Sequence, residues 1–359
     1  MKTILMVAGG TLGHINPALS FIKAIKNYDS TIKIIFFATK KDLKFEILKN
    51  NPLINEIYYF DVVGVPTNKI YILKNLIKNL KEIKTISKTL ESLNINCCIG
   101  MGGYISGIVI NICNKYKIPT IIHEQNSIIG LANKMVLSKV NLILTSFENT
   151  IIKNKYKNKT HFIGNPRYDE VNNFRYRNYQ NKNNILITSG SLGSKVINEK
   201  AIDFLNSEES KNYYTIVVTG TKYYQSTLKN IKQGSHYKII DFTDNLIKYI
   251  SNASIIISRA GSSTISEILS TKSVAIIIPS PNVAKNHQYY NAKVYSQQKL
   301  IMMVEEKYLI NNNLNIYINE ITNKYDYYKK NLNQYNLGSV TKRFIDLIKP
   351  YIERGLNND

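Results

Sequence analysis

Short runs of apolar, largely β-branched residues recur along this chain, and almost every run is apolar at each position instead of alternating with polar residues. A strand of that kind is buried on both faces, which is typical of parallel sheets covered by helices. Segments of helical length separate the runs, so the pattern predicts a parallel α/β architecture. The predicted strands are 3–8, 32–38, 95–99, 118–123 and 141–146 in the first half, and 185–189, 214–219, 237–242, 254–258 and 274–278 in the second.

The strand pattern occurs twice, and 359 residues exceed what one hydrophobic core usually supports, so we expect two doubly wound α/β domains. The stretch 154–184 is rich in Asn, Lys, Tyr and Arg and poor in aliphatic residues, and it is the predicted linker. Residues 340–352 place apolar side chains on one helical face, which predicts a terminal helix that packs on the protein.

Basic residues outnumber acidic ones, 47 against 25, for a formal net charge of +22. Such a charge attracts any anionic partner, whether nucleotide, nucleic acid or lipid headgroup. The lysines are scattered and belong to no recognisable nucleic-acid module, so we expect no nucleic-acid partner. No apolar run is long enough to span a bilayer and no signal-peptide layout precedes the first strand, which favours a cytosolic protein. The three cysteines show no metal-binding spacing and are expected to be buried thiols.

Three glycine-rich turns each follow a predicted strand and precede a predicted helix, over residues 9–14, 100–107 and 190–193. Backbone N–H groups in such turns favour a bound phosphate, because the following helix adds the positive end of its dipole. None of the three is a Walker A loop, and a tight turn that needs positive φ is the alternative for each one alone. Their common position at the carboxyl ends of strands favours phosphate sites.

The chain contains HEQN at 123–126, SRAGSSTISE at 258–267 and HQYYNA at 287–292, and this combination is specific. With four further segments, and in the same order, these motifs resemble those of the MurG family, the bacterial peptidoglycan N-acetylglucosaminyltransferases of glycosyltransferase family 28. The resemblance implies a GT-B fold, UDP-N-acetylglucosamine (UDP-GlcNAc) as donor, and inverting transfer to the C4 hydroxyl of N-acetylmuramic acid in undecaprenyl-linked lipid I, which gives lipid II. The seven segments are 9–20, 100–107, 121–134, 164–167, 189–198, 258–268 and 286–292.

The nearest alternatives to this reaction are those of another GT-B glycolipid glycosyltransferase and of a UDP-GlcNAc 2-epimerase. The HEQN motif and the turn at 100–107 argue against the epimerase. A basic nucleic-acid-binding protein is the alternative outside the enzymes, and it lacks a supporting motif.

The resemblance also implies domain roles. Residues 1–163 would bind lipid I and the membrane, residues 164–339 would bind UDP-GlcNAc, and the helix 340–359 would join the first domain. The protein would be peripheral on the anionic, cytoplasmic face of the cell membrane, with other cell-wall synthesis proteins as candidate partners.

The family's binding residues carry over onto matching positions of this chain. Leu12 stands where the family usually has glycine, and we expect an ordinary backbone there that contributes its N–H. The loops expected to contact the acceptor diphosphate contain Gly10, Gly13, Gly102, Gly103, Tyr104 and Ser106. The UDP-GlcNAc-binding residues are expected to be Thr11, Leu12, Gly13, Asn126, Arg167, Ser191, Thr243, Ser262, Ser263, Thr264, Ile265, Ser266, Glu267 and Gln288.

An inverting transfer needs a base for the attacking hydroxyl and stabilisation of the departing UDP. His14, at the entrance of the first helix, is the predicted base, because histidine accepts a proton near neutral pH. Binding a phosphate or stabilising the turn is its alternative role, and Glu124 is the alternative base. Because the chain has no Asp-x-Asp motif, helix dipoles and backbone amides are expected to replace a metal, and we expect no metal or other cofactor.

Glu267 has two competing interpretations. The pattern Thr264-x-x-Glu267 matches a capping box for a helix that begins near Ile265. The family instead places this carboxylate on the ribose hydroxyls, a role we favour because a carboxylate accepts two hydrogen bonds. Arg259 is expected to be a structural cation.

Residues 67–93 alternate apolar and basic side chains with helical spacing. A basic amphipathic helix of this kind fits a membrane surface, and the alternative is a packed helix with a solvated lysine face. Its predicted apolar face is Ile70, Leu73, Leu76, Ile77 and Leu80, flanked by Lys69, Lys74, Lys78, Lys81 and Lys84.

Overall fold

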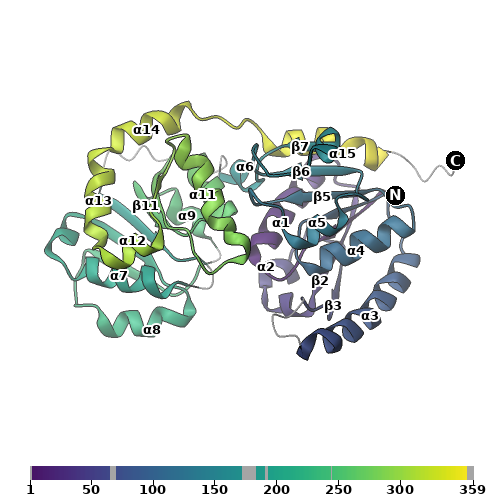
Figure 1. The fold of residues 1–359 in the computed structure, drawn as a ribbon, viewed down its shortest axis with the longest axis horizontal. Coiled ribbons are helices and arrows are strands. Elements are labelled where there is room, and N and C mark those ends of the chain that lie inside the picture. The colour runs from purple at the N-terminus through teal and green to yellow at the C-terminus, as the bar shows by residue number, and fades with distance from the viewer. Residues whose placement is uncertain (1, 65–69, 172–182, 191–192, 244, 354–359) are drawn as a thin grey trace. The chain divides into compact units, whose positions relative to one another are not determined.

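The computed structural model describes residues 2–64, 70–171, 183–190, 193–243 and 245–353 (Figure 1). The chain divides into two compact units, Met1–Pro166 with Ser339–Asp359, and Arg167–Gly338. The first division therefore falls after residue 166, whereas the sequence placed it after residue 163. The terminal helix α15 (Val340–Glu353) belongs to the first unit.

The first unit contains a sheet of parallel strands in the order β3-β2-β1-β4-β5-β6-β7. All the runs predicted as strands in this half are strands in the structure. Their side chains are buried on both faces of the sheet, which explains their uniformly apolar sequences. Their bounds are β1 (Thr3–Val7), β2 (Lys33–Thr39), β4 (Cys97–Gly100), β5 (Thr120–Glu124) and β6 (Leu142–Thr145). Two edge strands were not predicted, β3 (Glu56–Phe60) and β7 (Thr160–Phe162), since both are only partly buried.

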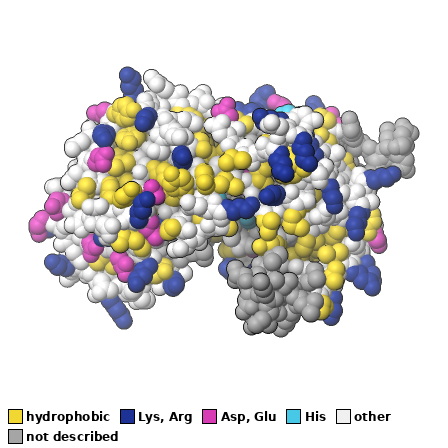
Figure 2. All heavy atoms as spheres, viewed as in Figure 1, with side chains coloured by type: hydrophobic (Ala, Val, Ile, Leu, Met, Phe, Trp, Pro, Cys, Tyr) yellow, Lys and Arg dark blue, Asp and Glu magenta, His cyan; other side chains and the backbone are white. Residues whose placement is uncertain are grey.

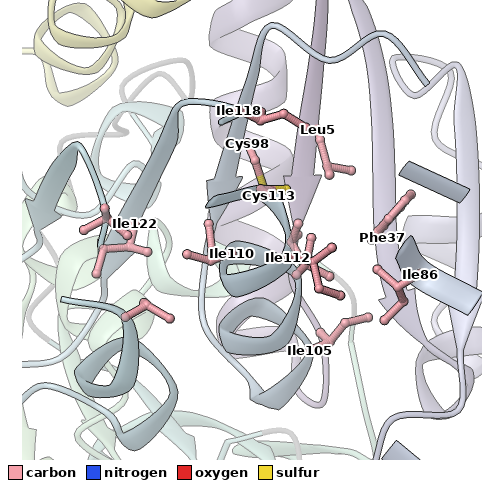
Figure 3. Close-up of a cluster of buried hydrophobic side chains, with 14 of the residues drawn as sticks. Leu5, Phe37, Ile86, Cys98, Ile105, Ile110, Ile112, Cys113, Ile118 and Ile122 are labelled. Carbon is pink, nitrogen blue, oxygen red and sulfur yellow. The ribbon is translucent and has the colours of Figure 1, made fainter. Parts of the chain in front are cut away.

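Helices cover both faces of this sheet. On one face, α3 (Ile70–Glu91), α4 (Tyr104–Lys115) and α5 (Leu131–Val136) pack against a core that includes Leu5 and Phe37 (Figure 3). Elsewhere in the unit, α1 (Leu12–Tyr28) lies against α15, and the rings of Phe21 and Phe344 stack 3.8 Å apart. The terminal helix thus docks on α1 as an apolar partner. The remaining elements are η1 (Lys40–Lys44), α2 (Glu46–Lys49) and η2 (Asn154–Lys159).

The second unit repeats the scheme with parallel strands in the order β10-β9-β8-β11-β12-β13. The predicted strands of this half are confirmed as β8 (Asn184–Thr188), β9 (Tyr214–Val218), β10 (Tyr237–Ile240), β11 (Ile255–Ser258) and β12 (Val274–Ile277). The two-residue β13 (Met302–Met303) was not predicted. The helices of the second unit are α6 (Arg167–Val171), α7 (Lys195–Leu205), η3 (Glu208–Asn212), α8 (Thr221–Asn230), α9 (Leu246–Ile250), α10 (Ser262–Thr271), η4 (Ala284–Asn286), α11 (His287–Gln297), α12 (Glu306–Asn311), α13 (Leu314–Asn323) and α14 (Tyr325–Gln334).

The predicted linker over 154–184 is only partly correct. Within it, η2 and β7 belong to the first unit, where β7 pairs with β6, and α6 opens the second unit. Residues 172–182 lie outside the described part of the chain. The polar composition of this stretch gave no indication of the short edge strand β7, because an edge strand buries few apolar side chains.

Each sheet has one point where the strand order reverses, between β1 and β4 in the first unit and between β8 and β11 in the second. The loops that leave two such strands diverge, and open α/β sheets bind ligands at these points. The glycine-rich turns of the sequence follow β1, β4 and β8. All three turns therefore lie at a reversal point of their own sheet.

Candidate functional site

The first glycine-rich turn leads from β1 directly into the amino end of α1. The helix begins at Leu12, and its N-cap residue Thr11 makes no capping hydrogen bond through its side chain. The first turn of α1 carries no acidic residue, so the helix presents unpaired N–H groups and the positive end of its dipole. Leu12 is helical and is absent from the described residues with positive φ, which confirms the ordinary backbone expected there.

A residue that the sequence analysis missed, Asp42, holds this turn from within. The Gly10 N–H donates to both carboxylate oxygens of Asp42, at 2.9 and 3.1 Å. The N–H and hydroxyl of Thr39 donate to Oδ2 at 2.9 and 2.6 Å, and Asp42 is fully buried. The Gly10 N–H is therefore already bound to a carboxylate of the protein. The backbone N–H groups that remain to meet a ligand at the start of α1 are those of Thr11, Leu12 and Gly13. The Thr-x-x-Asp capping-box pattern at 39–42 was the available signal.

The second turn, between β4 and α4, packs directly on the first. Gly102 and Gly103 have φ of +102° and +80°, a conformation that favours glycine. A Cβ on Gly103 would collide with the carbonyl of Gly9, and a Cβ on Gly102 would lie 2.8 Å from the His14 ring. These two glycines therefore permit close contact between the turns.

The amino end of α4 also lacks a side-chain cap and an acidic residue in its first turn. The Ser106 side chain is fully buried there, and its hydroxyl has no hydrogen-bond partner among the described residues. Tyr104 is exposed, and its ring lies against Gly64, where a Cβ would collide with it. Two uncapped helix ends, those of α1 and α4, thus lie at one reversal point.

His14 connects these turns to the HEQN segment at the end of β5. Its Nδ1 lies 3.2 Å from Oε1 of Gln125, and the Gln125 Nε2 donates to the Met101 carbonyl at 2.7 Å. Burial lowers the pKa of His14 below its ordinary value, while Glu124, the hydrogen bond to Gln125 and the Met101 carbonyl partly oppose this shift. The lowered pKa favours the neutral form of the His14 imidazole.

His123 lies behind Gln125 and is wholly buried. Its Nδ1 is 3.3 Å from Nε2 of Gln125, and its Nε2 lies 3.1 Å from the Gly164 carbonyl and 3.2 Å from the Ser146 hydroxyl. Burial lowers the pKa of His123 to about 4, so this imidazole stays neutral.

Glu124 is buried, and its hydrogen bonds hold the loop that follows β5. Oε1 accepts from the N–H and the side-chain amide of Asn126, at 3.0 and 3.2 Å. Oε2 accepts from the Gly130 N–H and the Asn133 amide, both at 2.9 Å. The carboxylate is thus occupied by the protein, which favours a structural role over that of a base. The same carboxylate also holds the Asn126 side chain, which is expected to bind UDP-GlcNAc.

In the second unit, the helix ends at the reversal point differ from each other. The helix α7, after the third glycine-rich turn, is capped by its own Ser194, which accepts from the Ile197 N–H. Ser191 lies outside the described residues. In contrast, α10 has no side-chain cap and no acidic residue in its first turn, and the Ser263 hydroxyl has no partner among the described residues. The expected run from Ser262 to Glu267 therefore begins at the open helix end of this unit.

Glu267 does not cap its helix, because α10 begins at Ser262 rather than near Ile265 and Glu267 lies inside it. The capping-box interpretation is therefore wrong. Both Nε and an Nη of Arg167 lie 2.7 Å from Oε1 of the buried Glu267, and Arg167 also pairs with Glu170. Burial raises the pKa of Glu267, and the adjacent Arg167 opposes that rise. Arg167 is thus bound to Oε1, which leaves Oε2 for a ligand.

The other residues expected to bind UDP-GlcNAc lie on separate elements of the second unit, Gln288 in α11, Ile265 in α10 and Thr243 in the loop before α9. Gln288 accepts from the Ser280 N–H at 2.9 Å, so its amide NH₂ remains as a donor. The Thr243 hydroxyl accepts from the Asn245 N–H at 3.1 Å, whereas Ile265 is fully buried and can offer only its backbone. Arg259 pairs with Glu306 and donates to the Ser194 hydroxyl and the Ile278 carbonyl, as expected of a structural cation.

The helix predicted over 67–93 is confirmed as α3 for residues 70–91. Residues 67–69 and the side chains of residues 70–74 and 76 lie outside the described set, so the predicted apolar face is described only at Ile77 and Leu80. Ile77 and Leu80 are 50% and 56% exposed. Lys78 pairs with Asp61 at 2.8 Å, whereas Lys81 and Lys84 are exposed. Within the described residues, no helix is long and apolar enough to cross a membrane.

Other sequence expectations concern metals, thiols and charge. In the described part of the chain, no group of three or more His, Cys, Asp or Glu side chains is placed to hold a metal ion. Cys97, Cys98 and Cys113 are buried free thiols, and burial raises the pKa of Cys97 to about 12. On the face shown in Figure 2, lysine and arginine side chains are scattered over both units.

The comparisons with known proteins cover both units. The glycosyltransferase family 28 N-terminal domain model matches residues 4–145, and the family 28 C-terminal domain model matches residues 184–349. The UDP-N-acetylglucosamine–N-acetylmuramyl-(pentapeptide) pyrophosphoryl-undecaprenol N-acetylglucosamine transferase of Halalkalibacterium halodurans is 32% identical over 332 residues, 87% of this chain and 88% of that protein.

Two solved structures have a similar fold. The crystal structure of MurG from Acinetobacter baumannii is 25% identical, with a TM-score of 0.75 over 98% of this chain and 100% of that chain. A UDP-GlcNAc 2-epimerase from Neisseria meningitidis, solved with UDP-GlcNAc bound, shares the fold at 15% identity and a TM-score of 0.64, over 97% of this chain and 100% of that one.

Proposed function

The chain belongs to glycosyltransferase family 28, and on that premise we propose that it transfers N-acetylglucosamine from UDP-GlcNAc to the C4 hydroxyl of N-acetylmuramic acid in undecaprenyl-linked lipid I, giving lipid II. The observation that carries this proposal is the likeness to the Halalkalibacterium halodurans enzyme over 88% of that enzyme's length. The protein is accordingly a UDP-GlcNAc-dependent glycosyltransferase of peptidoglycan synthesis.

The second unit is the proposed donor-binding unit. The open end of α10 offers backbone N–H groups and the Ser262 and Ser263 hydroxyls to the diphosphate of UDP. Glu267 would accept the ribose hydroxyls through Oε2, and the free amide of Gln288 would donate to the sugar. As the glycosidic bond breaks, charge develops on UDP, and the dipole of α10 stabilises it without reorganisation.

The first unit is the proposed acceptor unit. The uncapped ends of α1 and α4 lie side by side and suit the acceptor diphosphate, with the buried Ser106 hydroxyl as a further donor. His14 stands between the two turns and is the proposed base for the C4 hydroxyl.

We further propose a peripheral position on the cytoplasmic face of the cell membrane, through α3. The exposed Ile77 and Leu80 would enter the headgroup region, with Lys81 and Lys84 toward anionic lipid. Ile77→Ser with Leu80→Ser should weaken binding to anionic vesicles about tenfold while turnover of a water-soluble acceptor is kept.

The matched control for that test is Ile310→Ser with Ile316→Ser, which removes two equally exposed side chains from the second unit. Equal loss of vesicle binding in both double variants would contradict a membrane surface at α3.

The 2-epimerase alternative shares the fold, and the two reactions differ in their products. Incubation with UDP-GlcNAc and a lipid I analogue should release UDP only when the acceptor is present, and EDTA should leave the release unchanged. Conversion of UDP-GlcNAc to its epimer without acceptor would support the alternative instead.

A further inference from the structure

We propose that Gln125 is a positioning residue that fixes the tautomer of His14, with the proton on Nδ1 and the lone pair on Nε2. The catalytic meaning of this proposal rests on the proposed function, because it assigns His14 the role of base. The tautomer itself follows from the hydrogen bonds around Gln125.

The Met101 carbonyl determines which way the Gln125 amide points. A carbonyl oxygen can only accept, and it lies 2.7 Å from the Gln125 nitrogen, so the NH₂ group must face Met101. The Gln125 oxygen then faces His14, 3.2 Å from Nδ1. An amide oxygen also only accepts, so Nδ1 of His14 must carry the proton.

His123 fixes the same amide from the other side. The second N–H of Gln125 points at Nδ1 of His123, 3.3 Å away, which must then accept. The His123 proton consequently lies on Nε2 and is donated to the Gly164 carbonyl at 3.1 Å. The N–H groups of Gln125, His14 and His123 in this chain of contacts each meet an acceptor, and the Ser146 hydroxyl oxygen beside His123 Nε2 can only accept there. Flipping the Gln125 amide would leave two acceptors facing each other at Met101.

The surroundings also keep Gln125 in one place. Its side chain is 1% exposed, and the aromatic ring of Phe21 packs edge-on against His123 at 5.1 Å. Gly102 leaves just enough room for the His14 ring beside it. The amide therefore cannot rotate without disturbing packed neighbours.

The proton balance of the transfer requires this tautomer. The acceptor C4 hydroxyl gives its proton to Nε2 of His14 while its oxygen bonds to the anomeric carbon of GlcNAc. The bond between that carbon and the UDP oxygen breaks, and UDP leaves with the electron pair. His14 becomes an imidazolium whose Nδ1–H stays on the Gln125 oxygen, and it later returns the Nε2 proton to solvent. In the other tautomer Nε2 would already be protonated and could not act.

The test combines histidine nitrogen NMR with kinetics on the full chain. In ¹⁵N-histidine-labelled protein, the His14 signals, identified by their loss in His14→Gln, should show a neutral ring protonated at Nδ1. Gln125→Met keeps the length of the side chain but cannot accept this bond, and it should give a mixture of tautomers. Its kcat should fall about 100-fold, with the KM for UDP-GlcNAc changed less than twofold.

Asn114→Leu is the matched control, because it removes another part-buried amide at the opposite end of α4, where Asn114 bonds to the Ile110 carbonyl. It should keep both the His14 tautomer and kcat. The wild-type spectrum decides the proposal even if Gln125→Met does not fold: a His14 ring protonated at Nε2 would overturn it. A Gln125→Met enzyme with unchanged kcat would do the same. If wild-type protein transfers no GlcNAc, the proposed function fails while the spectrum still reports the tautomer.

Discussion

Asp42 binds the Gly10 N–H through both of its carboxylate oxygens, at 2.9 and 3.1 Å. The first glycine-rich turn is therefore built around a buried negative charge. That charge opposes a phosphate at Gly10 itself, since like charges repel strongly where water is excluded. A ligand is expected to meet this turn at Thr11 and Gly13, where the end of α1 is open.

Replacing Asp42 by Ala should destabilise the protein. The change leaves the Gly10 and Thr39 N–H groups without their acceptor, and each bond to a charged group contributes about 1.5–3 kcal/mol. We expect the free energy of unfolding to fall by about 3 kcal/mol or more in urea titrations. Asp29→Ala is the control, because Asp29 makes similar bonds to Thr31 at an exposed site and should cost much less.

Gly102→Ala should impair catalysis through His14. The added carbon would lie 2.8 Å from the His14 ring, and a displacement near 1 Å can cost about 100-fold in rate. We therefore expect a large fall in kcat with little change in the KM for UDP-GlcNAc. Gly190→Ala controls for backbone strain in melting experiments, because it also has positive φ but no atom lies within 4 Å of the added carbon. An unchanged kcat in Gly102→Ala would contradict the close contact.

Arg167→Ala should weaken nucleotide binding through Glu267. Without its partner, the buried carboxylate loses the charge that holds it in place, and the KM for UDP-GlcNAc should rise about tenfold. Competition assays with UDP and with uridine show how Arg167 acts. If it acts by holding Glu267 on the ribose, Arg167→Ala should weaken the binding of UDP and of uridine to the same extent. If it contacts the diphosphate directly, only the binding of UDP should weaken. Glu170→Gln is the control, because it leaves the pair of Arg167 with Glu267 intact.

Stability should fall as the pH drops from 6.5 towards 4. The folded pKa of His123 is about 4, below the ordinary 6.5, so in this range the unfolded chain binds a proton that the folded protein does not. His123 alone contributes about 3 kcal/mol to the free energy of unfolding, and this contribution is fully present above pH 6.5 and is lost as the pH falls. Urea titrations of His123→Gln should show a shallower dependence over this range, and an identical slope in both proteins would count against a neutral buried His123.

Much of the fold could be predicted because strands buried on both faces carry a strong, uniform signal. Edge strands such as β3 and β13 escaped prediction, since partial burial or a length of two residues produces no such run. The boundary of the first unit was likewise blurred by β7, whose polar composition resembles that of a linker.

The candidate site was predictable only in part. Glycine turns and the family resemblance indicate where ligands bind, but partners that come from distant positions leave no local pattern. Gln125 and Met101 meet His14 only in the folded chain, and Arg167 meets Glu267 across 100 residues. The start of α10 was misplaced by three residues, because Thr264 and Glu267 match a capping box that the helix does not use.

Mass spectrometry of the acceptor tests the central claim most directly. Purified protein incubated with UDP-GlcNAc and a lipid I analogue should add one N-acetylhexosamine to the acceptor, and nuclear Overhauser and coupling data should show a β linkage to C4. An acceptor whose mass stays unchanged, under conditions in which the protein binds UDP-GlcNAc, would contradict the proposed transfer.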